Sequence, residues 1–261
     1  MELWKGKWAL VTGASAGIGQ ALAAQLAASG AHLVLVARRL DRLERLAKEL
    51  GDRHGIRVEV LAADLARPGA PDEIFSFTSG KGIEVELLCN NAGFGAYGAF
   101  YKSELPRQLE MVQVNCGAVV HLTHLYLPPM IARGHGGILI LASTAAFQGV
   151  PYIATYAATK AFDLLFAEAL AEEARRHGVR VCALCPGSTT TEFQQVAGQP
   201  DRMFRSAETA EKVARVGLDA LAAGKSCVIS GLGNFLGAES QRFVPRRMVT
   251  RIAAKMFEPS A

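Results

Sequence analysis

Short apolar runs rich in Val, Ile and Leu alternate along the chain with longer segments in which apolar residues recur at helical spacing. Continuous apolar runs are typical of strands buried on both faces of a parallel sheet, and the longer segments are typical of helices that cover it. The runs predict seven strands near residues 7–12, 32–37, 56–62, 85–89, 137–142, 179–184 and 226–230. The intervening segments predict helices near residues 17–29, 39–54, 68–79, 103–133, 152–177 and 207–223.

This alternation predicts an α/β fold, in which a doubly wound, seven-stranded and mostly parallel sheet of the Rossmann type carries helices on both faces. No linker rich in Pro, Gly or Ser divides the 261 residues. We therefore expect a single cofactor-binding catalytic domain over residues 1–238 and a basic, amphipathic helical tail over residues 239–261. Ligands of such sheets bind beyond the carboxyl ends of the strands, so the residues that follow each strand are candidates for function.

Composition narrows the class of protein. Half of the residues are hydrophobic and 20% are charged, as in soluble globular proteins, and the net charge of +4 gives no case for a nucleic-acid partner. The five cysteines lie mostly in apolar runs, so no disulfide framework is expected. Cys182 and Cys185 have the spacing of a metal or redox pair, but in a strand they would point to opposite faces. The six histidines have no partners at metal-ligand spacing, so no metal is expected.

The N-terminal sequence MELWKGKWALVTG has no long apolar core behind a basic start, as a secretory signal would. No window of the chain reaches the roughly 18 uncharged apolar residues that a membrane-spanning helix needs. We therefore expect a cytoplasmic protein, with peripheral membrane contact through the tail as a further option.

The stretch TGASAGIG, from Thr12 to Gly19, follows the first predicted strand and opens an alanine-rich helix. Its glycines allow a tight turn and a close approach of a ligand, and the helix N-terminus offers free N–H groups to a pyrophosphate. The glycine spacing resembles that of the short-chain dehydrogenase/reductase family. The resemblance implies that this turn binds a nicotinamide dinucleotide through Gly13, Ser15, Gly17, Ile18 and Gly19.

The second predicted strand ends in the sequence VARR. In such folds an acidic residue near this point bonds the ribose 2′-hydroxyl of NAD(H), whereas an arginine accommodates the 2′-phosphate of NADP(H). Ala37 stands where the acid would be and Arg38 follows it, so NADP(H) is favoured over NAD(H). Arg38 could instead be a solvated charge ahead of a helix. Asp64 and Leu65, after the third strand, resemble the family's adenine-contacting segment, although Asp64 could also serve as a helix or turn cap.

Two further loops resemble the family, namely NNAG after the fourth predicted strand and PGSTTT after the sixth. In the family these loops line the cofactor, and the second covers its nicotinamide side. The resemblance therefore adds to the cofactor site Asn91, Ala92, Gly93, Pro186, Gly187, Thr189 and Thr191. Thr189 departs from the aliphatic residue that the family more often has there.

The stretch PYIATYAATK places Tyr152, Tyr156 and Lys160 four residues apart, so a helix would align them on one face. Tyr156 follows Ser143 by thirteen residues and precedes Lys160 by one turn, which matches the family's Ser and Y-x-x-x-K. The resemblance implies that Tyr156 is the acid/base, that Lys160 lowers its pKa and holds the nicotinamide ribose, and that Ser143 donates to the carbonyl oxygen. Asn115, at an expected break in the helix near 103–133, resembles the family's water-organising Asn on the proton path; it could equally cap the following helix.

These motifs cover roughly residues 6–231 and imply an NADP(H)-dependent oxidoreductase that interconverts a carbonyl and a secondary alcohol. The alternative function, of a different class, is that of a catalytically silent NADP(H)-binding sensor or scaffold of the same fold. Such a protein would not need Ser143, Tyr156 and Lys160 together. A dehydratase or epimerase is disfavoured by the glycine spacing. Family members commonly form homodimers or homotetramers through the helices expected near 103–133 and 152–177.

The segments 94–100, 147–152 and 192–204 are expected to line the substrate pocket, and they are rich in aromatic and apolar residues. They favour an apolar or amphiphilic carbonyl compound over a phosphorylated or dicarboxylic one. The pocket residues that we expect are Ser143, Phe94, Phe147, Tyr152 and Phe193.

Apolar residues recur at every fourth position of the tail, with basic residues around them. The apolar residues are Val244, Met248, Ile252 and Met256, and the basic residues are Arg246, Arg247, Arg251 and Lys255. Such a helix can lie on an anionic membrane surface, but it can also pack over the pocket or over a neighbouring subunit. We expect the tail to help receive a lipophilic substrate.

Overall fold

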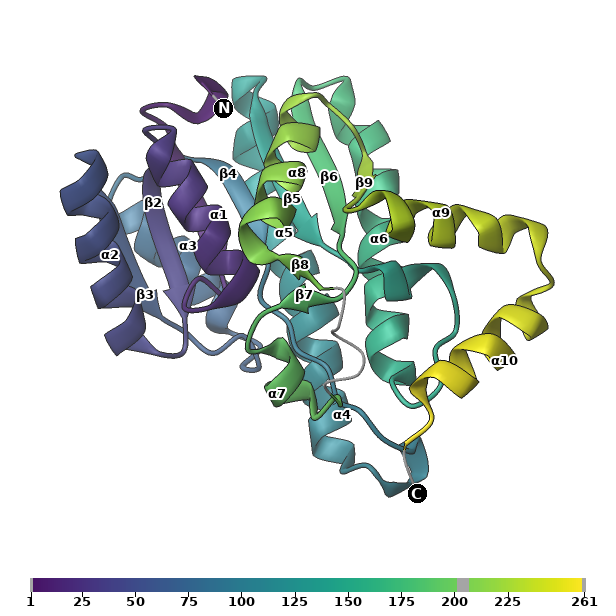
Figure 1. Ribbon diagram of the computed structural model, residues 1–261. Helices are drawn as coiled ribbons and strands as arrows, with labels where there is room; N and C mark the ends of the chain where they lie inside the picture. Colours follow the sequence, from purple (N-terminus) through teal and green to yellow (C-terminus); the bar gives the residue numbers. More distant parts are fainter. Residues whose placement is uncertain (1, 201–206, 260–261) are drawn as a thin grey trace.

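The computed structural model describes residues 2–200 and 207–259, and its central layer is a parallel sheet (Figure 1). In this part of the chain seven strands pair in the order β3-β2-β1-β4-β5-β6-β9. They are β1 (Trp8–Thr12), β2 (His32–Ala37), β3 (Val58–Ala62), β4 (Val85–Asn90), β5 (Gly136–Leu141), β6 (Val179–Cys185) and β9 (Cys227–Ile229). The strand order changes direction at β1 and β4, so the predicted doubly wound Rossmann sheet is confirmed.

Helices cover both faces of the sheet (Figure 1). One face carries α1 (Gly17–Ala28), α2 (Leu40–His54) and α8 (Ala210–Ala222), and the other carries α3 (Ala70–Gly80), α5 (Ala118–Arg133) and α6 (Ala154–Arg175). The remaining elements gather toward the carboxyl ends of the strands. They are α4 (Leu105–Val112), α7 (Phe193–Ala197), α9 (Leu232–Ser240), α10 (Arg246–Phe257) and the two-stranded pair of β7 (Thr189–Thr190) with β8 (Glu208–Thr209).

Each central strand contributes side chains to two hydrophobic cores, because successive side chains point to opposite faces of the sheet. On β1, Val11 packs into the core beneath α1, α2 and α8, whereas Leu10 packs into the core beneath α3, α5 and α6. On β6 the same alternation places Cys182 in the first core and Cys185 in the second, as predicted. Burial on both sides explains why the strands read as unbroken apolar runs, and it holds their carboxyl ends in fixed positions.

The helix expected near residues 103–133 is divided at the predicted place. A π-helical turn over Gln113–Gly117 joins α4 to α5, and Asn115 lies buried at its centre. Such turns free a side chain from the regular helical face and are frequent at functional sites.

One helix begins later than predicted, and this removes Tyr152 from it. The helix expected from residue 152 begins at Ala154, and Tyr152 adopts a left-handed φ of 66° in the preceding turn. Its carbonyl oxygen accepts a hydrogen bond from the backbone N–H of Gly98 at 2.8 Å instead of joining a helical ladder. Tyr152 therefore does not share a helix face with Tyr156 and Lys160, and that prediction was wrong.

The tail forms two helices. α9 runs through residue 238, so the expected boundary between domain and tail falls inside a helix, and the division remains a prediction. A short 3-10 turn over Gln241–Phe243 separates α9 from α10. Val244 precedes the first residue of α10, while the other three apolar residues of the predicted stripe lie on that helix.

Candidate active site

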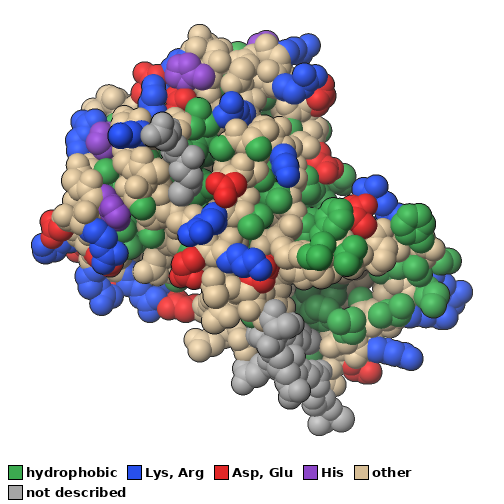
Figure 2. Space-filling view, turned by 45° about the horizontal axis from the view of Figure 1, so that its top comes forward, with side chains coloured by type: hydrophobic (Ala, Val, Ile, Leu, Met, Phe, Trp, Pro, Cys, Tyr) green, Lys and Arg blue, Asp and Glu red, His purple; other side chains and the backbone are tan. Residues whose placement is uncertain are grey.

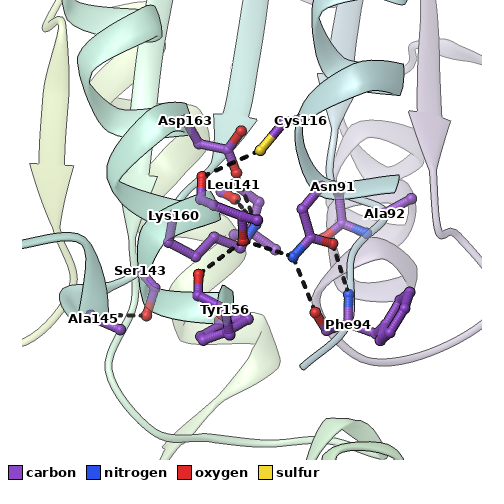
Figure 3. A network of polar contacts seen from close by, with 12 residues as sticks. Asn91, Ala92, Phe94, Cys116, Leu141, Ser143, Ala145, Tyr156, Lys160 and Asp163 are labelled. Atoms are coloured by element: carbon purple, nitrogen blue, oxygen red, sulfur yellow. Dashed lines mark hydrogen bonds and ion pairs between the residues drawn. The ribbon is translucent and has the colours of Figure 1, made fainter. Parts of the chain in front are cut away.

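Ser143, Tyr156 and Lys160 converge beyond the carboxyl end of β5 (Figure 3). Ser143 follows β5, and its hydroxyl oxygen accepts a hydrogen bond from the backbone N–H of Ala145 at 3.1 Å, which caps a short 3-10 helix. Tyr156 and Lys160 lie on the first two turns of α6, one above the other. The hydroxyl of Ser143 lies close enough to that of Tyr156 to lower the pKa of the phenol through hydrogen bonding. The spacing found in the sequence therefore brings these three groups together in space.

Lys160 is held by two acceptors deep in the protein. Its ammonium group donates to the carbonyl oxygen of Leu141, the last residue of β5, at 2.6 Å. It also donates to Oδ2 of Asp163 at 3.0 Å, and it lies 6.0 Å from the centre of the Tyr156 ring. The bond to the strand end fixes the height of the ammonium relative to the sheet.

Asp163 is a member of this site that the motifs did not reveal. It is fully buried on α6, and its second oxygen, Oδ1, has no hydrogen-bond partner within residues 2–200 and 207–259. An acidic residue three positions after a lysine is a common surface pattern on helices, so the sequence offered a weak signal for it. Its burial beside Lys160 is what allows its charge to act on the pKa of Tyr156.

The surroundings of Tyr156 act on its pKa in opposite directions. Burial of the ring is the largest influence and raises the pKa of the phenol above its ordinary value. The ammonium of Lys160 and the hydrogen bond with Ser143 lower this pKa, whereas the negative charge of Asp163 raises it. Lys160 thus acts in the direction expected from the sequence, but burial outweighs it in the protein alone.

The ion pair between Lys160 and Asp163 is also shaped by burial. Burial is the largest influence and disfavours the charged ammonium, but Asp163 and Tyr156 together with the smaller contribution of Cys116 outweigh it, and the pKa of Lys160 is raised. Burial raises the pKa of Asp163 to about 6, although Lys160 pulls it down. Near neutral pH both groups are therefore charged, with Asp163 close to its titration range.

Asn115 links the loop after β4 to α6. Its amide nitrogen donates to the carbonyl oxygen of Phe94 and to the hydroxyl of Thr159, both at 3.0 Å, and its oxygen accepts from the N–H of Phe94 at 3.1 Å. The side chain makes no cap for α5, whose N-cap is Gly117. The role of Asn115 on a proton path remains a prediction, and its position beside Lys160 is compatible with that role.

The glycine turn is packed too tightly for side chains. Gly13 and Gly17 have left-handed φ values of 66° and 56°, and a Cβ on Gly19 would lie 2.3 Å from the carbonyl oxygen of Gly13. Asn91, directly after the neighbouring strand β4, holds the turn in place, since its Nδ2 donates to the carbonyl oxygen of Thr12 at 2.8 Å. The first turn of α1 consequently presents its N–H groups at the end of a closely packed cradle.

Two arginines after β2 occupy different surroundings. The side chain of Arg38 is 62% exposed and lies 3.9 Å from Glu110. Arg39 bonds the hydroxyl of Ser15 and forms an ion pair with Glu192 at 2.8 Å. Arg42 pairs with the same carboxylate, and these two arginines lower the pKa of Glu192. Glu192 belongs to the segment 192–204 that was expected at the pocket, but its pairing with Arg39 was not predicted, because 153 residues separate the two.

One cleft of about 660 Å³ runs past the glycine turn, the two arginines after β2 and the trio of Ser143, Tyr156 and Lys160. The cofactor residues predicted from the sequence all line it, namely Gly13, Ser15, Gly17, Ile18, Gly19, Arg38, Asp64, Leu65, Asn91, Ala92, Gly93, Tyr156, Lys160, Pro186, Gly187, Thr189 and Thr191. Asp64 also accepts a hydrogen bond from the N–H of Ala66 at 3.1 Å, so the turn role weighed for it is present as well.

The substrate end of the cleft contains only some of the expected residues. Ser143, Phe94 and Phe193 line it, and the rings of Tyr156 and Phe193 lie 5.3 Å apart. Phe147 packs against the core under α6 and Tyr152 lies in its turn, so neither is among the lining residues. Residues 201–204 of the expected lining lie outside the described residues. Val150 and Val196, which belong to the expected segments 147–152 and 192–204, do line the cleft, and so do Ile153, Asn234, Gln241 and Phe257, which were not among the expected pocket residues.

The donor set and shape of this cleft fit a dinucleotide. The cradle has no room for a Cβ at Gly13 or Gly19, and the first residues of α1 line the cleft, where a helix N-terminus favours an anion such as a pyrophosphate. Arg38, Tyr156 and Lys160 all line this cleft. The model of the short chain dehydrogenase family matches residues 7–201, which contain all of these groups.

The chain belongs to the short chain dehydrogenase family. Its curated relatives include a very-long-chain 3-oxoacyl-CoA reductase of Phaeosphaeria nodorum, which is 36% identical over 196 residues. That match covers 74% of this chain and 58% of the relative, so the chain aligns with little more than half of the relative's length.

Solved structures of this family extend the likeness across nearly the whole chain. A short-chain dehydrogenase of Sphingobium yanoikuyae, solved with NADPH, has a TM-score of 0.84 and 28% identity, with 93% of this chain and 95% of that chain covered. A 7beta-hydroxysteroid dehydrogenase has a TM-score of 0.87 and 25% identity, with 97% and 98% covered. The family and the fold expected from the motifs are thereby confirmed.

Three further observations concern residues 2–200 and 207–259. None of the helices formed by these residues is long and apolar enough to cross a membrane. Over the same ranges His, Cys, Asp and Glu side chains form no group of three or more that could hold a metal ion. The five cysteines are free thiols.

Proposed function

We propose that this short chain dehydrogenase is an NADP(H)-dependent oxidoreductase that interconverts a carbonyl compound and a secondary alcohol, with Tyr156 as the acid/base. The observation that carries the proposal is the convergence of Tyr156, Ser143 and Lys160 on the wall of one cleft. A silent sensor or scaffold needs the glycine turn but not this trio.

The glycine turn and the N-terminus of α1 would hold the pyrophosphate of the cofactor, and Lys160 would hold its nicotinamide ribose. When bound, the nicotinamide supplies or accepts the hydride, and its oxidised form adds a positive charge near Tyr156. The exposed guanidinium of Arg38, with Ala37 in place of an acid, supports the choice of NADP(H) over NAD(H).

Tyr156, Ser143 and Lys160 have separate roles in the proton transfer. In reduction Tyr156 gives its phenolic proton to the carbonyl oxygen, and in oxidation its phenolate takes the proton from the alcohol. Ser143 stabilises the negative charge on the substrate oxygen by donating a hydrogen bond. Lys160 favours the phenolate, which matters more because burial disfavours that charged form.

The substrate end of the cleft supports an apolar or amphiphilic carbonyl compound. Its walls include Phe94, Val150, Ile153, Phe193 and Phe257, whose side chains offer van der Waals contact and few polar groups. Similarity to a very-long-chain 3-oxoacyl-CoA reductase and to a 7beta-hydroxysteroid dehydrogenase supports bulky lipophilic ketones as substrates. We therefore place 3-oxoacyl thioesters and steroid ketones first among candidate substrates.

Self-association is part of the proposal. Large apolar side chains on the outer faces of α4 and α6 are exposed in the single chain, and they include Leu105, Leu109, Phe162 and Leu165. Burial of these side chains between copies supports a homodimer or homotetramer through these helices.

The proposed function is tested by following NADPH absorbance with 3-oxoacyl thioesters of increasing chain length, steroid ketones, small ketones and sugars, with NADH in parallel. We expect turnover with a lipophilic ketone and a preference for NADPH. Cofactor binding without turnover on any carbonyl or alcohol would favour the scaffold, and a preference for NADH would overturn the role of Arg38.

A further inference from the structure

The outer face of α10 presents apolar side chains to solvent. Met248, Ile252 and Met256 follow one another at every fourth position and are 55%, 50% and 65% exposed. The helix meets the body of the protein through the small side chain of Ala253 and through Phe257, which pack with Val150 and other residues of a minor apolar cluster. The strongest apolar stripe of this helix is therefore the one that the fold leaves uncovered.

The preceding segment extends this apolar surface. Leu232, Phe235 and Leu236 on α9 are exposed, and Phe243 in the connecting turn is 88% exposed. Figure 2 shows apolar side chains gathered over this projecting part of the molecule, with basic side chains along its outer rim. We call the exposed apolar residues of α9, the turn and α10 the tail surface.

A row of positive charge borders the apolar stripe. Arg247, Arg251 and Lys255 each precede a residue of the stripe by one position, so they form a parallel row about 100° around the helix. All three are exposed. An apolar stripe flanked by a basic row is the arrangement of helices that lie in the interface of an anionic bilayer.

The alternative occupant is a second copy of this chain. A two-fold contact through the tail surface would bring the two basic rows near each other, and like charges in proximity oppose association. An anionic lipid surface instead complements the row and accepts the apolar stripe at the same time. We propose that the tail surface docks on an anionic lipid bilayer.

The tail surface is continuous with the mouth of the cleft. Met256 belongs both to the exposed stripe and to the cleft lining, and its neighbour Phe257 lines the cleft as well. The carbonyl oxygen of Phe257 accepts a hydrogen bond from the hydroxyl of Tyr97 at 2.8 Å, and Gln241 bonds Gln148 at 2.6 Å. Docking would thus bring the mouth of the cleft to the bilayer. A lipophilic substrate could then pass directly from the bilayer into the cleft, and this last step rests on the proposed function.

Docking is measured by co-sedimentation of the full chain with phosphatidylcholine vesicles that contain either no anionic lipid or 30% phosphatidylglycerol, without substrate or cofactor. The apolar stripe is tested with Met248→Glu/Ile252→Glu, and Leu3→Glu at the opposite end of the molecule is its control. The basic row is tested with Arg247→Gln/Arg251→Gln. Its control is Arg45→Gln/Arg53→Gln on α2, which removes the same charge from another exposed helix.

We expect binding to the anionic vesicles, weakened at least about tenfold by either tail double variant and unchanged by either control. Circular dichroism of each variant shows whether it keeps the fold. Equal binding to neutral vesicles, or equal loss in the controls, would overturn the proposal. The proposal would also be overturned if the unmodified protein bound no vesicles and Met248→Glu/Ile252→Glu lowered the mass of the particle in light scattering. That result would show that the tail surface forms a contact between copies of the chain. Because neither readout involves turnover, failure of docking is distinct from failure of the proposed function.

Discussion

The ammonium of Lys160 lies 3.0 Å from the carboxylate of Asp163, and this ion pair is buried within one turn of α6. Lys160 also contacts the end of β5 and faces the ring of Tyr156. Asp163 therefore partly neutralises the cation that favours the Tyr156 phenolate, and its charge raises the pKa of Tyr156. A carboxylate that does not touch the cleft thus influences the acid/base group in it.

The substitution Asp163→Asn should move the pH profile of alcohol oxidation toward lower pH. The amide keeps an acceptor for Lys160 but removes the negative charge, so the uncompensated ammonium favours the phenolate more strongly. The measurement is kcat/KM for oxidation as a function of pH, and exposed Asp72→Asn serves as the control. A profile identical to that of the unmodified enzyme would show that the charge of Asp163 does not act on Tyr156.

The same group makes stability depend on pH. The pKa of Asp163 is raised from 3.8 to about 6, so between these values the folded protein holds a proton that the unfolded chain has released. The contribution of Asp163 to the free energy of unfolding therefore falls as pH rises through this window, and it is lost above about pH 7. Urea unfolding should show that the unmodified protein gains about 1 kcal/mol relative to Asp163→Asn on going from pH 7.5 to pH 5. A difference that is flat over this range, or of opposite sign, would contradict the raised pKa.

Tyr156→Phe should remove most turnover and leave NADPH binding nearly intact. Loss of a positioned acid/base costs roughly 10²- to 10⁴-fold in rate, while the ring still fills its place beside Phe193. Tyr152→Phe is the matched control, because Tyr152 lies in the turn before α6 and outside the cleft lining. Steady-state kinetics and NADPH fluorescence distinguish the two variants. Turnover retained in Tyr156→Phe would exclude the mechanism.

Most of the fold was predictable because its signals are local. Buried parallel strands read as apolar runs, and the two cores on either side of β1 explain why Leu10 and Val11 are both buried. The glycine turn and the spacing of Ser143, Tyr156 and Lys160 were also visible, since each motif lies near one strand end.

The remaining site residues depend on packing that no local pattern carries. Asp163 has the spacing of an ordinary helical ion pair, and only the docking of α6 on the sheet buries it. Arg39 and Glu192 meet across the cleft from distant segments. Aromatic content placed Phe147 among the expected pocket residues, but its side chain packs against the core under α6 instead, and residue type alone does not distinguish these two positions.

Arg38→Leu should reduce kcat/KM with NADPH by roughly 10- to 100-fold, which corresponds to the loss of a charged hydrogen bond to the 2′-phosphate. Activity with NADH should change little, because its ribose carries no phosphate for Arg38 to bind. Arg45→Leu, on the exposed side of α2, controls for the loss of charge. Parallel kinetics with both cofactors decide the matter: an equal reduction with NADPH and NADH would assign Arg38 a structural role.

Gly19→Ala should disrupt the cofactor cradle. Its Cβ would lie 2.3 Å from the carbonyl oxygen of Gly13 and 2.5 Å from the amide nitrogen of Asn91, so the turn and the next strand would have to separate. Overpacking of this kind costs about 1–3 kcal/mol in the free energy of unfolding, and NADPH affinity should fall with the displaced N–H groups. Gly51→Ala within α2 is the matched control, since its nearest neighbour would be 3.7 Å away and alanine should add about 0.5–1 kcal/mol there. Urea unfolding with NADPH titration separates the two effects, and unaltered NADPH affinity in Gly19→Ala would show that the turn does not bind the pyrophosphate.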